Sequence, residues 1–234
     1  MACSVSATQL GLRGSRGWVY RDVTFDAPPG AIVVVAGEAG SGRSSLLLTL
    51  AGRMRPTTGH AHVGEFRIPE RLHAVQRKVG LGVFAGLNDL DDTLTVNDLA
   101  REQLALRGHL RHYVHGGEKV TEVLDSVGLD VAPRTYVRDL SPRDRMLLGI
   151  ALGLVGQPDV IAVDNADAGM HLADQQRIWA QLATLAAIGI TVLASCLDPG
   201  PATAALEAAA AGALVVPLPD RHALTLPESA HARA

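Results

Sequence analysis

Three short apolar runs, rich in β-branched side chains, predict strands that are buried on both faces. They are AIVVVA at 31–36, DVIAV at 159–163 and TVLAS at 191–195. Uninterrupted apolar runs of this length are typical of the interior of a parallel sheet, where helices cover both faces. Weaker β signals extend the predicted sheet structure, and they lie at 10–27, 60–68 and 214–217.

The segments between these strands carry helical periodicity. Because strands alternate with helices, the pattern predicts an α/β fold with a mainly parallel sheet. A helical block at about 86–154 is expected to form a subdomain inserted into a core of residues 1–85 and 155–220. The whole chain, 1–234, is then a single domain that ends in a disordered tail at 226–234. The expected helices lie at 44–52, 96–108, 117–127, 141–155, 172–188 and 201–211, with a short helix and strand at 71–80.

The composition is that of a globular protein with an aliphatic core. The chain has 234 residues, of which 47% are hydrophobic and only 3% aromatic. Its formal net charge of −3 provides no strong attraction to nucleic acid, which we exclude as a partner. No apolar run reaches the ~18 residues of a membrane-spanning helix, and the first residues lack the apolar core of a signal peptide. The two cysteines make neither a disulfide framework nor a metal motif, which is typical of a reducing compartment.

A glycine-rich segment follows the first buried run. GEAGSGRSS at 37–45 fits the phosphate-loop pattern G-x-x-x-x-G-K-[ST], except that Arg43 replaces the lysine. Glycines allow backbone N–H groups to converge on phosphate oxygens, and the positive end of the next helix adds to the attraction. Ser44 is expected to ligate Mg²⁺, whereas the longer, planar Arg43 either reaches the phosphates by another path or points away. The predicted nucleotide-binding residues are Gly37, Glu38, Ala39, Gly40, Ser41, Gly42, Arg43, Ser44 and Ser45.

Further motifs follow in a fixed order. Asp164 ends the apolar run at 160–163, and a carboxylate in that place beside a phosphate loop predicts a second Mg²⁺ ligand. Upstream, Leu140-Ser141 opens a helix that leads into this strand. Together with DVTF at 22–25, AGRMRP at 51–56, LTV at 94–96, QPDV at 157–160 and GITV at 189–192, these motifs resemble the nucleotide-binding domain of ATP-binding cassette (ABC) transporters.

The resemblance covers nearly the whole chain and implies a P-loop NTPase fold of ABC type, with an N-terminal antiparallel β part and an inserted helical subdomain. It implies ATP and Mg²⁺ as cofactors. A second nucleotide-binding domain, identical or different, would face this one, and Ser141 would bind the γ-phosphate across the interface. Closure of the pair would drive a membrane permease through the helical subdomain. The implied location is cytoplasmic, at the inner face of the cell membrane.

The chain departs from the family at its catalytic positions. Asn165 stands where the family carries the catalytic glutamate, and an amide cannot take a proton from water. Leu197 stands where a histidine contacts the γ-phosphate. The remaining departures are Pro142 and Arg143 for the two signature glycines, Phe84 or Ala85 for the glutamine that senses Mg²⁺, His171 for the aspartate of the following loop, and Gly14 for the aromatic residue under adenine, with Trp18 or Tyr20 as substitutes.

These departures favour an ATP-binding subunit with weak or absent hydrolysis. Loss of one transition-state donor typically costs about 10²–10³ in rate, and several are missing here. The alternative is an active ATPase that pairs with a complete partner cassette. A small-molecule kinase built on the same phosphate loop is a third hypothesis, which leaves Leu140-Ser141 and the helical block unexplained.

Overall fold

The parallel sheet at the centre of the molecule confirms the predicted α/β class. The computed structural model describes residues 3–106 and 116–220, so the predicted disordered tail at 226–234 lies outside the described residues. Five strands pair in the order β6-β7-β8-β3-β9, and every pairing is parallel. In that order the strands are Val79–Leu81, Val160–Val163, Thr191–Cys196, Ile32–Ala36 and Ala213–Pro217.

A second, antiparallel sheet is formed by the N-terminal part of the chain. Its strands are β2 (Gly17–Ala27), β1 (Val5–Gly14), β4 (Thr58–Val63) and β5 (Phe66–Ile68), in that spatial order. The β signal predicted for 10–27 is therefore two strands joined by a turn at residues 15 and 16. The prediction began too late, at residue 10, because the polar residues Ser6, Thr8 and Gln9 weaken the apolar pattern of β1.

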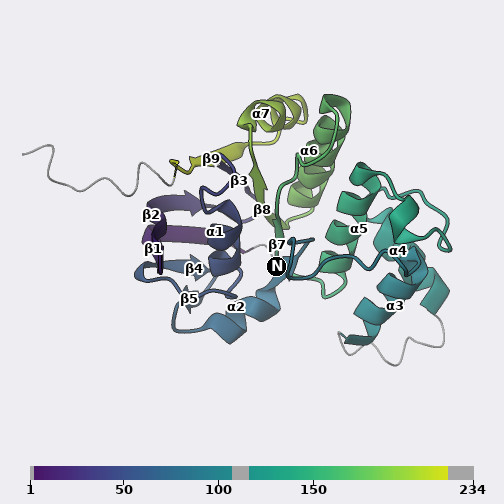
Figure 1. Cartoon of the computed structure of the whole chain (residues 1–234), viewed down its shortest axis with the longest axis horizontal. Helices are drawn as coiled ribbons and strands as arrows, with labels where there is room; N and C mark the ends of the chain where they lie inside the picture. Colours follow the sequence, from purple (N-terminus) through teal and green to yellow (C-terminus); the bar gives the residue numbers. More distant parts are fainter. Residues whose placement is uncertain (1–2, 107–115, 221–234) are drawn as a thin grey trace, which may run out of the picture.

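The helices lie in two groups (Figure 1). The helices α3, α4 and α5 gather on the side of the molecule away from the antiparallel sheet, whereas α6 and α7 lie along the parallel sheet. No helix in the described part of the chain is long and apolar enough to cross a membrane. The helices are α1 (Arg43–Leu50), α2 (Leu72–Lys78), α3 (Val96–Leu106), α4 (Gly116–Asp125), α5 (Pro142–Leu154), α6 (Leu172–Ala187) and α7 (Pro199–Ala208), with a short 3-10 turn at Val137–Asp139.

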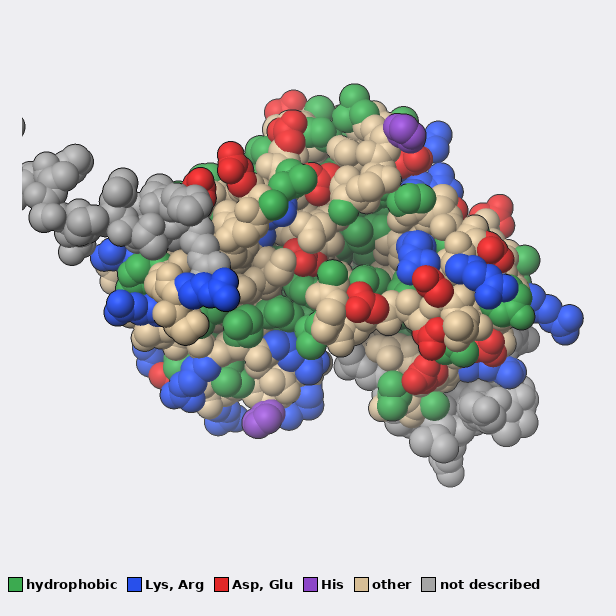
Figure 2. Space-filling model, viewed as in Figure 1, with side chains coloured by type: hydrophobic (Ala, Val, Ile, Leu, Met, Phe, Trp, Pro, Cys, Tyr) green, Lys and Arg blue, Asp and Glu red, His purple; other side chains and the backbone are tan. Residues whose placement is uncertain are grey.

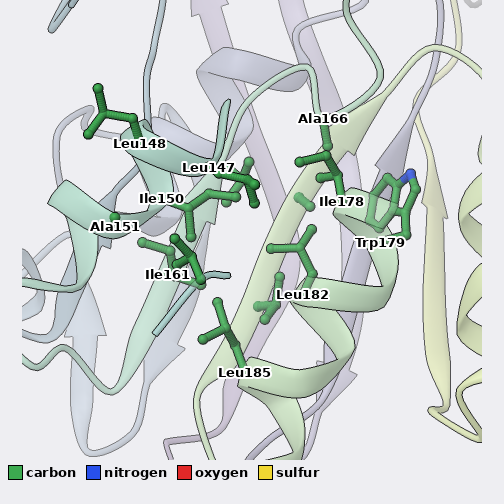
Figure 3. Packing of buried hydrophobic residues seen from close by; sticks show 14 of the residues in the cluster. Leu147, Leu148, Ile150, Ala151, Ile161, Ala166, Ile178, Trp179, Leu182 and Leu185 are labelled. Atoms are coloured by element: carbon green, nitrogen blue, oxygen red, sulfur yellow. The ribbon is translucent and has the colours of Figure 1, made fainter. Parts of the chain in front are cut away.

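The parallel sheet has a hydrophobic core on each face. Ile32 and Val34 of β3 pack on the side of α5 and α6, whereas Val33 and Val35 pack toward α1 and the antiparallel sheet. This alternation arises because successive side chains of a strand point to opposite faces. Figure 3 shows the first core, where α6 contributes the fully buried Trp179. Since β3 is packed on both faces and between two strands, its carboxyl end is a rigid support for the loop that follows.

Candidate functional site

The phosphate loop, residues 37–45, runs from the end of β3 into the first turn of α1 and lies against β2. Gly42 precedes α1 with a φ of 95°, a conformation that favours glycine. A Cβ atom at Gly42 would lie 2.4 Å from the carbonyl oxygen of Val19, so a side chain cannot be accommodated without a shift of the backbone. The close contact with β2 therefore requires glycine at this position.

The amino terminus of α1 is open. Gly42 provides no side-chain cap, and no acidic residue lies in the first turn. The first N–H groups of an α-helix have no acceptor within the helix and carry partial positive charge. The backbone N–H groups of Arg43, Ser44 and Ser45 therefore lie at an uncapped helix terminus, where the partial positive charge favours an anion.

Two buried polar side chains of the loop lack hydrogen-bond partners. The hydroxyl of Ser41 and Nη1 of Arg43 are both buried and unpaired, and the two residues are only 1% and 7% exposed. An unpaired buried donor costs roughly 1–3 kcal/mol. The positive charge of Arg43 also opposes the rise that burial causes in the pKa of Cys196, at the end of β8. Arg43 is thus buried beside the loop with a donor that an anion could satisfy.

Asp164 lies at the carboxyl end of β7 and joins the loop to β8. Ser44 Oγ donates to Asp164 Oδ2 at 2.6 Å, and Ser195 Oγ donates to Asp164 Oδ1 at 2.5 Å. The contact with Ser195 follows from the register, because Val163 pairs with Ala194 and the next residues continue side by side. Ser195 was not predicted as a site residue, although a polar residue at the end of the buried run TVLAS was a signal.

The pair Ser44 and Asp164 fits a magnesium ion chemically. Magnesium prefers oxygen ligands, and this site offers one hydroxyl and one carboxylate beside a phosphate-binding loop. Asp164 is 5% exposed, so its charge is shielded from water and is held by protein donors. Among the described residues, no group of three or more His, Cys, Asp or Glu side chains is placed to hold a metal ion.

Asn165 continues from Asp164 in a left-handed conformation, with a φ of 48°. Its backbone N–H donates to Ser195 Oγ at 2.8 Å, and its side-chain amide donates to Asp164 Oδ2 at 3.4 Å. The amide therefore faces the carboxylate as a donor. It provides no group that can accept a proton with the basicity of a carboxylate.

Leu197 follows β8 and points its side chain toward solvent, with 53% of the residue exposed. Its backbone N–H donates to Asp167 Oδ2 at 2.7 Å, whereas Asp167 Oδ1 is buried without a partner. The leucine side chain can neither donate nor accept a hydrogen bond. Asp167, which contacts the segment after β8, is a second residue that was not predicted from the sequence.

Ser141 lies apart from these residues, at the start of α5. Its Oγ accepts the N–H of Asp144 at 3.1 Å and donates to Asp144 Oδ2 at 2.7 Å, so it caps the helix. Arg143 holds the other oxygen of Asp144, Oδ1, at 2.7 Å. Within the described chain, no hydrogen bond links Ser141 to the phosphate loop.

Three aromatic residues have clear positions. Tyr20 is fully buried and its hydroxyl donates to Thr49 at 2.7 Å, so the suggestion that Tyr20 lies under adenine is wrong. Phe84 is 2% exposed and belongs to the core. Two guanidinium groups lie over the ring of Trp18, that of Arg13 at 5.9 Å and that of Arg21 at 5.4 Å from the ring centre. Of the two proposed substitutes for the adenine platform, only Trp18 remains.

The sequence is similar to those of ATP-binding proteins of ABC transporters. The uncharacterized ABC transporter ATP-binding protein YphE of Escherichia coli is 28% identical over 176 residues, which cover 74% of this chain and 35% of that protein. The methionine import ATP-binding protein MetN of Bradyrhizobium diazoefficiens is 29% identical over 195 residues, which cover 81% of this chain and 55% of MetN. The chain thus spans about a third to about half the length of these curated relatives.

Solved structures agree in fold. CbiO1 from Clostridium perfringens, described as part of the ABC transporter complex CbiONQ, matches with a TM-score of 0.73 and 18% identity over 88% of this chain and 82% of that chain. A family model described as "ABC transporter" matches residues 20–168. Because that model covers more than half of the chain, and the fold and the order of motifs agree with it, the chain belongs to the ABC transporter family.

Proposed function

We propose that this chain is the ATP-binding subunit of an ABC transporter, which binds MgATP at residues 37–45 and hydrolyses it weakly or not at all. The observation that carries the proposal is the contact of Ser44 with Asp164 behind an uncapped helix terminus. The unpaired polar atoms of Ser41 and Arg43 support it, because phosphate oxygens would satisfy them.

Each part of the loop has a proposed role. The backbone N–H groups of the loop and the side chains of Ser41, Arg43 and Ser45 hold phosphate oxygens. Ser44 and Asp164 hold Mg²⁺, which when bound neutralises phosphate charge. The phosphate-binding set consists of Gly37, Glu38, Ala39, Gly40, Ser41, Gly42, Arg43, Ser44 and Ser45.

Weak hydrolysis follows from the residues near Asp164. Asn165 stands at the position of the catalytic base and acts as a hydrogen-bond donor to Asp164. Leu197 presents no polar atom from its side chain, and Phe84 is buried in the core. Attack by water would therefore lack both a base and a side-chain donor for the developing charge.

The proposed partners are a second nucleotide-binding domain and a membrane permease, with the complex at the cytoplasmic face of the membrane. Ser141 would meet the nucleotide of the second domain. A groove of about 230 Å³ runs between α3, α5 and the loop after β6. Leu106 at this groove and the nearby Leu87 are 74% and 56% exposed, which supports a contact with a partner on the helical subdomain.

An active ATPase in an asymmetric pair is the second candidate. Asp167 favours it, since a carboxylate oxygen without a partner lies near the loop after β8. In such a pair, a complete partner cassette would supply the second nucleotide site. The small-molecule kinase hypothesis has no support from the family assignment.

The test combines calorimetry of MgATP binding with phosphate release, on the wild type and on Asn165→Glu. We expect measurable binding, negligible phosphate release by the wild type, and faster release by the variant. If the wild type releases phosphate as fast as Asn165→Glu does, the active ATPase would be favoured. Absence of MgATP binding would overturn the proposal.

A further inference from the structure

The face formed by α2, β5 and the segment after α1 carries an excess of positive charge. Residues 53–78 contain five arginines and one lysine against two glutamates, in a chain with a formal net charge of −3. Figure 2 shows Lys and Arg side chains gathered at the lower left of the molecule, over β4, β5 and α2. Such a local excess in an acidic chain attracts anions to this face.

A pocket of about 450 Å³ opens within this face. Arg55, Arg71 and Arg77 line it, and we call these three residues the arginine pocket. In the described part of the chain, none of their guanidinium groups has a hydrogen bond or an ion pair. Glu70 also lines the pocket and is paired with Arg67 at 3.3 Å, so the three arginines keep an excess of positive charge there.

The chemistry of the three side chains favours one kind of ligand. A guanidinium presents five N–H donors in a planar fork that matches phosphate and carboxylate oxygens. A carboxylate has two oxygens and one charge, which one or two arginines saturate. A phosphate group has more oxygens and up to two charges, so it can bridge three guanidinium groups that surround one concavity.

The pocket is separate from the phosphate loop. Arg55 follows the carboxyl end of α1, whereas the phosphate loop precedes the amino end of the same helix. Arg71 and Arg77 belong to the segment that leads into the amino end of β6. The pocket therefore lies toward the amino ends of the parallel strands, whereas Asp164 lies at their carboxyl ends. A ligand in the pocket would not compete with the nucleotide.

We propose that the arginine pocket binds a phosphate group at a site distinct from the nucleotide site. The headgroup of an anionic phospholipid and a soluble phosphate ester both carry this group. A subunit that works beside a membrane would meet the first, and any cell fluid would supply the second. The inference does not depend on ATP binding or hydrolysis.

The test uses the full chain with two probes. The first is sodium pyrophosphate, and the second is vesicles of equimolar phosphatidylcholine and phosphatidic acid, compared with vesicles of phosphatidylcholine alone. Hydrogen exchange reports protection at residues 69–78 separately from residues 37–45, which separates the pocket from the phosphate loop. Calorimetry and vesicle sedimentation give the affinities.

The variant is Arg55→Gln/Arg71→Gln/Arg77→Gln, and its matched control is Arg134→Gln/Arg138→Gln/Arg177→Gln, which removes the same charge from exposed positions elsewhere. The single variant Arg71→Gln serves if the triple variant does not fold. We expect protection at 69–78 in the wild type and at least about tenfold weaker binding in the pocket variant, while the control binds like the wild type.

The two probes also identify the source of the phosphate. Protection by pyrophosphate indicates a soluble phosphate ester, and protection only by vesicles that contain phosphatidic acid indicates a lipid headgroup. The proposal is overturned if neither probe protects residues 69–78, and this includes the case in which pyrophosphate protects only residues 37–45. It is also overturned if the control variant weakens binding as much as the pocket variant, because general surface charge would then explain the effect.

Discussion

Ser195 Oγ donates to Asp164 Oδ1 at 2.5 Å, and this contact joins the carboxyl ends of two neighbouring strands. Ser195 Oγ also accepts the backbone N–H of Asn165 at 2.8 Å, and Ser195 is completely buried. Since Ser44 holds the other oxygen of Asp164, the two hydroxyl groups together fix the rotation of the carboxylate. The geometry that Asp164 would present to the proposed Mg²⁺ therefore depends on Ser195, which is not itself a proposed ligand.

Replacement of Ser195 should weaken the magnesium site without touching the phosphate loop. We expect Ser195→Ala to raise the Mg²⁺ concentration needed for tight ATP binding by about tenfold, since loss of a residue that orients a metal ligand typically costs 10–100-fold in metal affinity. Affinity for ATP without Mg²⁺ should stay unchanged, and Ser195→Thr should restore the wild-type requirement. Calorimetry over a series of Mg²⁺ concentrations checks this, and an equal loss with and without Mg²⁺ would contradict it.

Arg43 is expected to lower the stability of the empty protein and to raise the affinity for nucleotide. Its buried Nη1 has no partner, which costs roughly 1–3 kcal/mol. Arg43→Met should therefore raise the free energy of unfolding, by about 1 kcal/mol, and lower MgATP affinity by about tenfold or more. Urea unfolding and calorimetry measure the two effects. Arg134→Met is the control. A decrease in both stability and MgATP affinity in Arg43→Met would contradict the prediction that the two change in opposite directions.

Two glycines of the loop provide a matched pair. Gly40 and Gly42 both have positive φ, at 85° and 95°, but only a Cβ at Gly42 would meet a neighbour, 2.4 Å from the Val19 oxygen. Gly40→Ala should cost about 1–2 kcal/mol from backbone strain alone. Gly42→Ala should cost more and should also abolish MgATP binding. Equal unfolding free energies for the two variants would refute the contact with β2.

Tyr20 is expected to act in the core alone. Its hydroxyl donates to Thr49, which in turn donates to the backbone carbonyl of Ser45. Tyr20→Phe should lower the free energy of unfolding by about 1 kcal/mol, through loss of one buried hydrogen bond, and leave MgATP affinity unchanged. Denaturant unfolding and calorimetry test this. Trp18→Ala is the comparison, because it should weaken nucleotide binding if that ring supports adenine.

Stability should fall at alkaline pH because of Cys196. Burial, together with the negative charge of Asp167, raises the pKa of its thiol to about 12, and the positive charge of Arg43 opposes the rise. The ordinary thiol pKa is near 9. The stabilising effect of the raised pKa is therefore complete below pH 9 and is lost as pH rises toward 12, by about 1.4 kcal/mol per pH unit.

The variant Cys196→Ala removes this contribution. We expect its unfolding free energy to fall less steeply than that of the wild type between these pH values, in denaturant titrations at several pH values. Burial also raises the pKa of Tyr20 to about 12, so some alkaline destabilisation should persist above pH 10. Identical slopes for the wild type and Cys196→Ala would show that the thiol does not contribute.

Much of the fold was predictable because its signals are local. Buried strands are predicted by apolar runs, and the phosphate loop is nine consecutive residues with glycines where the backbone must turn. The closeness of Asp164 to the phosphate loop was predictable from its place at the end of a strand, since the carboxyl ends of parallel strands lie on the same side of the sheet. The first half of β1 was missed because its polar residues face outward in a sheet that the local pattern does not reveal.

Local patterns in the sequence thus predicted the helices, most of the strands and the order of the motifs, with a candidate phosphate loop among them. Only the three-dimensional arrangement shows that Ser195 holds Asp164, that Tyr20 is buried against Thr49, and that Arg55 joins Arg71 and Arg77 around one pocket. These relationships bring together residues far apart in the chain. They depend on which strands are neighbours and on the register between them, and local periodicity carries information about neither.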